Sequence, residues 1–134
     1  MTIVESRSDE DPVVLTSREM DVMNVLWHLG SGTVSEVQDG LPDKLAYTTV
    51  LTVLRTLERK GHVRHEAEGR AHRYVPLVDK VEAQEGAVRR VTRKLFSGSP
   101  ERLMAHLLSE KGLTEEQLRR LRALVDERLG GEDK

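Results

Sequence analysis

Residues 45–61 of the chain read Leu-Ala-Tyr-Thr-Thr-Val-Leu-Thr-Val-Leu-Arg-Thr-Leu-Glu-Arg-Lys-Gly. Within this stretch the apolar residues recur at the spacing that gathers side chains on one side of a helix: Val50, Val53, Leu54 and Leu57. At about 100° per residue, the opposite side carries Thr48, Thr52, Arg55 and Arg59. A solvated helix face usually mixes Glu with Lys, whereas this side offers hydroxyl and guanidinium groups. The stretch predicts either a helix that packs on one side and contacts a partner on the other, or a half-buried helix whose outer side is merely polar.

The composition limits the class of protein. A chain of 134 residues is about one domain long, or one small domain with an appendage. Because aromatic residues make up only 3%, Leu, Val, Ala and Met must fill most of the core, which suits helix packing. The absence of cysteine excludes disulfides, thiolate metal sites and Cys nucleophiles. No apolar run approaches the roughly 18 residues of a membrane span and the first residues lack a signal-peptide core, so we expect a cytoplasmic protein with no direct membrane insertion.

The net charge of -2 hides an uneven distribution along the chain. Residues 1–41 hold two basic and eight acidic side chains, residues 42–75 hold seven and four, and residues 76–134 hold twelve and eleven. The middle segment is therefore at +3, between neighbours at -6 and +1. Such a local positive excess is expected where one surface meets a polyanion.

The amino-terminal part of the sequence predicts a tail and then a helix. Residues 1–13 are acidic and poor in apolar side chains, so we expect them to form a disordered tail. Thr16-Ser17-Arg18-Glu19 is a capping box, which predicts the start of a first helix. Trp27 lies on the apolar side of this helix, where we expect it in the core, and Gly30 can supply the left-handed turn that ends it.

A second, shorter helix is predicted before the 45–61 stretch. Ser35-Glu36-Val37-Gln38 has the pattern of a capping box, and Gly40 with Pro42 must close the helix that it opens. Two helices joined by so tight a connection form a helix-turn-helix, in which the second member enters a groove.

After Gly61 the hydrophobic period changes from helical to alternating over residues 62–66 and 71–75. The four residues between them, Ala67-Glu68-Gly69-Arg70, contain the glycine that a hairpin loop with a bulge needs. Because two strands alone would be marginally stable, Thr33-Val34 is a candidate third strand. A helix-turn-helix followed by a hairpin predicts a winged-helix DNA-binding domain over residues 14–77.

From Asp79 the pattern is helical to the end, and caps at Ser99-Pro100 and Thr114 divide it into three helices. These helices carry more apolar surface than they can cover alone, so the simplest partner is a second copy of the chain. We expect a helical dimerisation domain over residues 78–130 and a disordered tail over residues 131–134. Its contact residues would be Val88, Val91, Leu95, Leu103, Leu107, Leu118, Leu121 and Val125. The alternative is that the helices fold back on the winged helix of the same chain.

The predicted fold is therefore mainly α with a small antiparallel β-wing, a winged helix-turn-helix domain followed by a three-helix dimerisation domain. Three motifs within it, at residues 45–54, 57–63 (Leu-Glu-Arg-Lys-Gly-His-Val) and 69–74 (Gly-Arg-Ala-His-Arg-Tyr), resemble the BlaI/MecI/CopY family of penicillinase repressors. The resemblance covers about residues 15–129. It implies a homodimeric repressor of transcription that binds an inverted-repeat operator in double-stranded DNA and dimerises through its carboxy-terminal helices.

The resemblance also implies that proteolysis relieves repression. In β-lactam-responsive members a membrane sensor-protease pathway cuts the dimerisation domain, which implies an antibiotic or cell-envelope stress signal. The corresponding bond here lies between His106 and Leu107, where staphylococcal relatives have Asn-Phe. The copper-responsive branch carries a cysteine cluster, and this chain contains no cysteine.

Residues of the basic middle segment are the candidate DNA contacts. Thr48, Thr49 and Thr52 match the contacting side of the family's recognition helix and can meet thymine methyl groups or base-edge acceptors. Arg55 can reach a guanine or a phosphate, and Tyr47 either touches the DNA backbone or packs. Phosphate contacts are expected from Arg59, Lys60, Arg70 at the wing tip and Arg73, with a solvated side chain as the alternative for each arginine.

Neither a metal site nor an enzyme site is expected. Of the three histidines on the hairpin, His62 and His65 point to opposite faces of an alternating strand, so only His65 and His72 can converge. Two ligands are too few for a structural zinc site. No Ser-His-Asp order, glycine-rich phosphate loop or paired-carboxylate site is present, and no cofactor is expected. Two other functions stay open, a winged helix that binds proteins and a repressor released by a small ligand.

Overall fold

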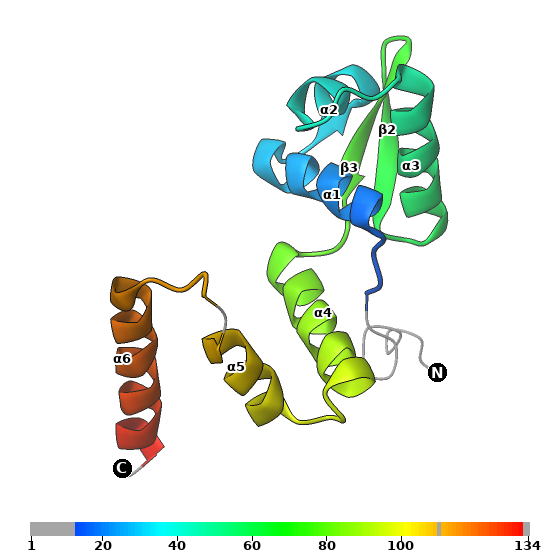
Figure 1. Cartoon of the computed structure of the whole chain (residues 1–134). Coiled ribbons are helices and arrows are strands. Elements are labelled where there is room, and N and C mark those ends of the chain that lie inside the picture. Colours follow the sequence, from blue (N-terminus) through cyan, green and yellow to red (C-terminus); the bar gives the residue numbers. More distant parts are fainter. Residues whose placement is uncertain (1–12, 110, 133–134) are drawn as a thin grey trace. The chain divides into compact units, whose positions relative to one another are not determined.

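The computed structural model describes residues 13–109 and 111–132 and is mainly helical, with one small antiparallel sheet (Figure 1). In chain order the elements are α1 (Ser17–Leu29), β1 (Gly32–Thr33), α2 (Val34–Gly40), α3 (Tyr47–Arg59), β2 (Val63–Glu68), β3 (Ala71–Pro76), α4 (Lys80–Leu95), α5 (Pro100–Ser109) and α6 (Glu115–Glu132). The first six form a winged helix-turn-helix and three helices follow, so the predicted fold class is confirmed. The chain divides within α4 into two compact units, one ending at Arg90 and one beginning at Val91.

Helix α1 begins at the predicted capping box. The backbone N–H of Glu19 donates to Thr16 Oγ1 at 3.2 Å, and the N–H of Thr16 donates to Glu19 Oε1 at 2.8 Å. Gly30 follows the helix with φ of 88°, a left-handed conformation that residues with a side chain rarely adopt. Both helix ends are therefore where the sequence predicted them.

Helix α2 begins two residues earlier than predicted, so the assignment of its capping box to Ser35 and Gln38 was wrong. The box is formed by Thr33, whose Oγ1 accepts from the N–H of Glu36 at 3.2 Å, and by Glu36, whose Oε1 accepts from the N–H of Thr33 at 3.1 Å. The earlier start brings the side chain of Val34 into the core. Gln38 serves another purpose, because its amide donates to the carbonyl of Leu45 at 2.8 Å and holds the connection to α3.

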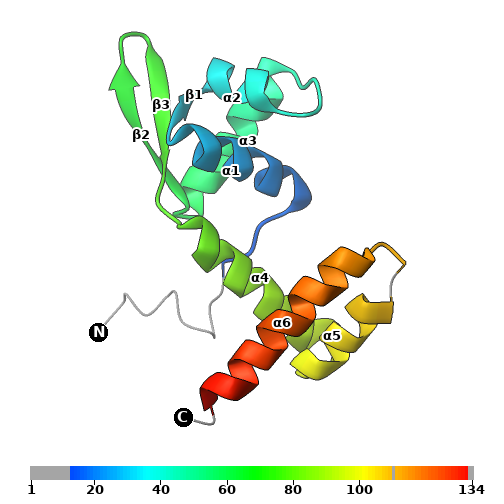
Figure 2. The same cartoon turned by 90° about the vertical axis from the view of Figure 1, so that its left-hand side faces the viewer.

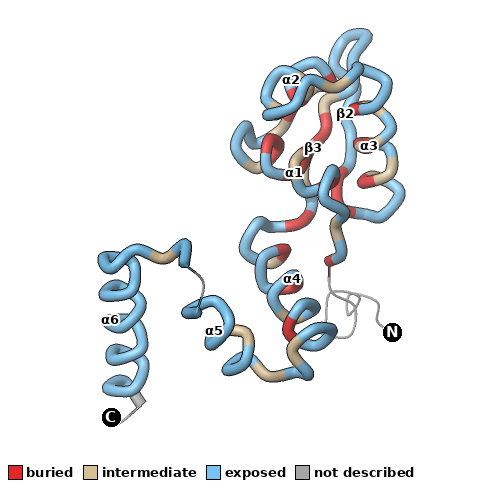
Figure 3. Tube along the Cα trace, in the orientation of Figure 1, coloured by how far each residue is buried: buried red, intermediate tan, exposed pale blue. Residues whose placement is uncertain are grey.

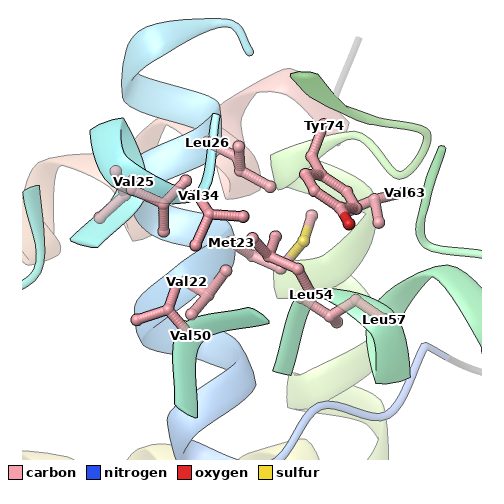
Figure 4. Packing of buried hydrophobic residues seen from close by; sticks show 11 residues of the cluster. Val22, Met23, Val25, Leu26, Val34, Val50, Leu54, Leu57, Val63 and Tyr74 are labelled. Atoms are coloured by element: carbon pink, nitrogen blue, oxygen red, sulfur yellow. The ribbon is translucent and has the colours of Figure 1, made fainter. Parts of the chain in front are cut away.

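One hydrophobic cluster joins α1, α2, α3 and the hairpin (Figure 4). On α3 the predicted apolar side is confirmed, since Val50, Leu54 and Leu57 are fully buried and Val53 packs at the edge. Burial of each such side chain contributes about 1.5–3 kcal/mol to folding. Because these three residues fix the inward side of α3, they also fix which residues of α3 face outward.

The sheet has the strand order β1-β3-β2, and all its strands are antiparallel. β1 pairs Gly32 with Tyr74, which confirms the third strand near the predicted place. The hairpin turn is shorter than predicted, because pairing continues to Glu68 opposite Ala71 and leaves two residues in the turn rather than four. Gly69, the first of these two, has φ of 62°, and glycine with positive φ is typical of this position in two-residue hairpin turns.

Helix α4 starts against the winged helix, which is why the first compact unit extends beyond residue 77. The indole Nε1 of Trp27 donates to the carbonyl of Val78 at 2.8 Å. Val13, Val78 and Ala83 form a second buried cluster at this place, with Trp27 packed against it. Val13 is thus part of the folded structure rather than of the predicted tail, whose other members, residues 1–12, lie outside the described residues.

In the second unit the predicted caps recur. Ser97 and Gly98, with φ of 53° and 76°, end α4, and the N–H of Arg102 donates to Ser99 Oγ at 3.1 Å. At the start of α6, Thr114 and Gln117 form the predicted reciprocal box at 2.8 and 3.0 Å. Helix α6 runs on to Glu132, past the predicted start of the tail at 131, and residues 133–134 lie outside the described part.

The second unit buries little of its surface by itself (Figure 3). Its apolar side chains are widely exposed, for instance Leu95 at 76% and Leu129 at 58%. Across the described residues, no helix is long and apolar enough to cross a membrane.

Candidate nucleic-acid interface

The outward side of α3 presents the threonines that the sequence singled out. Thr48, Thr49 and Thr52 are all exposed, as the burial of the opposite side requires. The hydroxyl of Thr52 donates to the carbonyl of Thr48 at 2.9 Å, so its oxygen lone pairs and methyl group remain available to a partner. These are groups that meet base-edge donors and thymine methyls in a major groove.

The start of α3 is unusual because no side chain caps it. Ala46 occupies the N-cap position and makes no side-chain hydrogen bond, and the first turn holds no acidic residue. Uncapped backbone N–H groups at the positive end of a helix bind phosphate well. Tyr47, 49% exposed, and Lys44 lie at this end. We did not single out Lys44 from the sequence, although a cation just before a helix without a cap residue is a readable signal.

Two arginines, Arg55 on α3 and Arg70 in the turn of the wing, are exposed and have no hydrogen bond or ion pair with any described residue. Arg59, in the last turn of α3, is also exposed, but its guanidinium donates to Thr56 Oγ1 at 3.3 Å. Figure 2 shows the hairpin extending past the end of β1, so that its turn protrudes from the unit. Of the arginines in the basic segment, Arg55 and Arg70 are therefore the two most available to a polyanion.

Lys60 is engaged inside the unit. Its Nζ lies 2.8 Å from Oε1 of Glu19, a side chain that is almost fully buried at the start of α1. Burial by itself raises the pKa of Glu19, but hydrogen bonds from Lys60 and from the Thr16 backbone outweigh it and leave the pKa lowered. Lys60 thus joins the end of α3 to the start of α1, and its phosphate contact stays a prediction.

Arg73 is also engaged inside the unit. Its Nε and Nη2 donate to the two carboxylate oxygens of Glu68 at 2.6 and 3.0 Å, and Nη1 and Nη2 donate to Glu36 at 3.1 and 3.3 Å. Nη1 also donates to Ser31 Oγ at 3.2 Å. Arg73 therefore binds carboxylates of its own chain, with which a phosphate contact would have to compete. The sequence did not reveal this, because the partners lie 5 to 42 residues away.

These contacts shift the pKa of each ionisable partner. The pKa of Glu68 is lowered by the hydrogen bond from Arg73. The pKa of Glu36 is lowered first by the hydrogen bond from the Thr33 backbone and then by Arg73, while the pKa of Arg73 is raised by Glu68 and Glu36. All three groups are thus held in their charged forms.

The hairpin histidines behave as the alternation predicted. His65 and His72 stack with their ring centroids 4.2 Å apart, and His62 is buried apart from them. Nδ1 of His65 also lies 2.7 Å from a carboxylate oxygen of Glu58 on α3. In residues 13–109 and 111–132, no three His, Asp or Glu side chains are grouped so that they could hold a metal ion.

Comparisons with known proteins show what the chain is similar to. A family model described as penicillinase repressor matches residues 15–127. The transcriptional regulator BlaI of Mycobacterium tuberculosis is 36% identical over 112 residues, which cover 81% of this chain and 80% of that protein. The penicillinase repressor of Bacillus licheniformis is 25% identical over 115 residues, covering 84% and 90%. The solved DNA-binding domain of the repressor BlaI is 31% identical, with a TM-score of 0.47, over 51% of this chain and 85% of that one.

The family match begins just before α1 and ends in α6, so it includes both compact units. The uncapped start of α3, its exposed threonines and the protruding wing all lie inside the matched residues. On these grounds the chain belongs to the penicillinase repressor family.

Proposed function

We propose that the chain is a transcriptional repressor that acts as a homodimer on an inverted-repeat operator in double-stranded DNA. The observation that carries the proposal is the division among its basic side chains. Lys60 and Arg73 bind carboxylates of the chain, whereas Arg55, on α3 with the exposed threonines, and Arg70, in the turn of the wing, are exposed and have no hydrogen bond or ion pair with any described residue. Such a surface offers both base-reading and phosphate-binding groups.

Each group has a distinct role in this proposal. Thr48, Thr49 and Thr52 meet base edges in the major groove, and Arg55 reaches a guanine or a phosphate. The start of α3, with Tyr47, lies against the DNA backbone. Arg59 contacts a phosphate beyond the base-reading part of α3, and Arg70 contacts the backbone or enters the minor groove.

The proposed dimer supplies the sequence specificity that one small DNA-binding domain lacks. A single winged helix makes few base contacts, so two half-sites are read by two copies, one helical turn or a multiple apart. The proposed dimer contact uses the exposed apolar residues of the second unit, among them Val91 at 40%, Leu118 at 39% and Leu121 at 39%. An exposed apolar set of this extent is typical of a surface that another molecule covers.

We further propose that proteolysis in the dimerisation domain ends repression, under a β-lactam or cell-envelope stress signal relayed by a membrane sensor-protease pathway. The proposed bond, His106–Leu107, lies inside α5, where the ring of His106 packs edge-on against Phe96 with centroids 5.8 Å apart. A protease needs an extended substrate, so α5 must unfold locally before cleavage. Cleavage there would separate α6 from α4 and so divide the proposed dimer contact.

A binding titration tests the proposal. The full chain is titrated with duplex DNA from the promoter region of its own gene and with a scrambled duplex, each at about 50 and 200 mM salt. We expect tighter binding to the promoter duplex and a steep loss of affinity with salt. Equal, weak binding to both duplexes would reject the repressor and would favour a winged helix that binds proteins.

A further inference from the structure

A network of four side chains joins the wing to the helix-turn-helix. Arg73 on β3 binds Glu68, the last residue of β2 before the turn, and also Glu36 in the first turn of α2 and Ser31 before β1. Both carboxylates receive two hydrogen bonds from the one guanidinium. This fork geometry is specific to arginine and fixes direction as well as distance.

The outer part of the wing has few other restraints. β1 pairs with β3 only at Tyr74 and Arg73, so the part of the hairpin between Arg73 and the turn consists of two strands. A two-stranded hairpin is marginally stable by itself in water. Of the two β3 residues that pair with β1, Arg73 is the one nearer the turn, and its side chain reaches diagonally across the hairpin to Glu68, next to the turn.

The charges in the network matter because of what the wing is proposed to approach. Glu36 and Glu68 repel each other, and Glu68 directly precedes Gly69 and Arg70 in the chain. Without Arg73, two carboxylates would face each other there, and one of them would stand near the DNA phosphates that Arg70 is proposed to meet. With Arg73 the network has a net charge of -1 instead of -2.

We propose that Arg73 is a positioning residue that orients the wing for DNA, and that it does not contact DNA itself. The proposal rests on the proposed function for its consequence, since a correctly held wing is what allows Arg70 to reach the backbone. It reverses the expectation that Arg73 belongs to the phosphate-binding set. It also makes Glu36 and Glu68, two acids in a DNA-binding unit, contributors to operator affinity.

The binding test compares Arg73→Gln, Arg73→Lys and Arg70→Ala in the full chain against the promoter duplex over a range of salt concentrations. We expect Arg73→Gln to weaken binding about five- to tenfold while the salt slope stays that of the wild type. Arg70→Ala should instead reduce the slope by about one. Arg73→Lys should bind about as weakly as Arg73→Gln, because one ammonium cannot pair bidentately with two carboxylates.

A double-variant comparison separates the network from a general loss of structure. Glu36→Gln keeps the capping oxygen of α2, since Gln also serves at this position of a capping box. If the network acts as a unit, the double variant Glu36→Gln/Arg73→Gln should bind DNA about as well as the single variant Arg73→Gln. Additive losses from the two changes would contradict the proposal.

Amide hydrogen exchange of the free protein provides a readout that needs no DNA. Arg73→Gln should speed exchange at the wing amides of Glu66 and Ala71, which lie in hydrogen-bonded pairs of the hairpin, while the amides of Met23 and Leu26 in α1 exchange as in the wild type. Unchanged wing exchange would overturn the positioning role, and so would a reduced salt slope together with recovery in Arg73→Lys, which would mark a direct phosphate contact. If wild-type protein failed to prefer the promoter duplex, the proposed function would fall, whereas the exchange comparison would still decide whether Arg73 holds the wing.

Discussion

The two compact units of the chain differ in how they are stabilised. Every buried hydrophobic side chain in the described residues precedes Arg90, and in the first unit such side chains from α1, α2, α3 and the hairpin form one cluster. From α6, by contrast, all the described side chains are exposed. The first unit has a core of its own, whereas the helices of the second unit have well-formed caps but little core. From this difference we expect the winged helix to fold by itself and the second unit to gain stability in the proposed dimer.

The largest effect should come from a cavity in the first unit. Leu54→Ala removes a fully buried side chain at the centre of α3 and should lower the free energy of unfolding by about 3 kcal/mol. Urea unfolding followed by the fluorescence of Trp27, which lies in this unit, measures the loss. Leu124→Ala, at a residue 61% exposed in α6, is the control and should leave this transition unchanged. Equal effects of the two substitutions on this transition would contradict the conclusion that the first unit has a core of its own and the second does not.

A charge in the proposed dimer contact should have the next largest effect. Leu121→Asp should dissociate the dimer and lower operator affinity by about 30-fold, because one winged helix then binds each half-site alone. Sedimentation measures the mass, and circular dichroism checks that the helices persist. Ala123→Asp adds the same charge about 200° around α6 and should leave the dimer intact. A Leu121→Asp protein that still sediments as a dimer would argue against α6 as the contact.

The ion pairs of the two units should also differ in how much they contribute to stability. Lys60→Met removes the partner of a buried carboxylate, Glu19, and should lower the free energy of unfolding by about 2 kcal/mol. Arg119→Met removes an exposed pair within α6, in which Arg119 Nη2 lies 2.8 Å from Glu115, and should cost less than about 0.5 kcal/mol. The Trp27 transition reports the first change and helix content the second. If Lys60→Met lowered the free energy of unfolding no more than Arg119→Met does, the stability of the first unit would not depend on the Lys60–Glu19 ion pair.

Within the first unit, two variants with smaller effects distinguish a base contact, which determines sequence preference, from a contact to the DNA backbone, which does not. Arg70→Ala should weaken binding to all sequences alike, by about three- to tenfold. Thr52→Ala should alter the preference among operator variants, with a change of similar size at one or two positions. Binding to a panel of single-base operator variants measures both. Identical profiles for the two proteins would mean that the assigned roles are wrong.

The smallest expected effect is on the wing alone, at acid pH. Glu36 and Glu68 have lowered pKa values in the folded chain, so they contribute stability that is complete above the ordinary carboxyl pKa of 4.5 and is lost as the pH falls through the lowered values. Wing amides should therefore lose protection below about pH 4.5 and show no change between pH 6 and 8. In Arg73→Gln the pH dependence should be smaller. A pH dependence in Arg73→Gln as large as that of the wild type would show that it arises from another carboxylate, for instance Glu19, whose pKa is also lowered.

Much of the fold could be predicted because its signals are local. The spacing of Val50, Leu54 and Leu57 indicated the buried side of α3, and the boxes at Thr16 and Thr114 indicated where α1 and α6 begin. Each signal lies within one or two helical turns, so periodicity and capping chemistry suffice to read it. The same holds for the stacking of His65 with His72, which follows from the alternation of strand faces.

The sequence by itself determined the order of helices and strands, the outward threonines of α3 and the excess of apolar surface in the last three helices, because all of these follow from residues close together in the chain. Only the tertiary structure decided that Thr33 rather than Ser35 caps α2, that Val13 is folded, and that Lys60 binds Glu19. It also decided that Arg73 binds Glu36 and Glu68. The physical reason is that a cation on an exposed strand or helix end looks the same in sequence whether it faces solvent or a carboxylate from another element. Packing decides which basic side chains bind carboxylates inside the unit and which, like Arg55 and Arg70, have no such partner among the described residues.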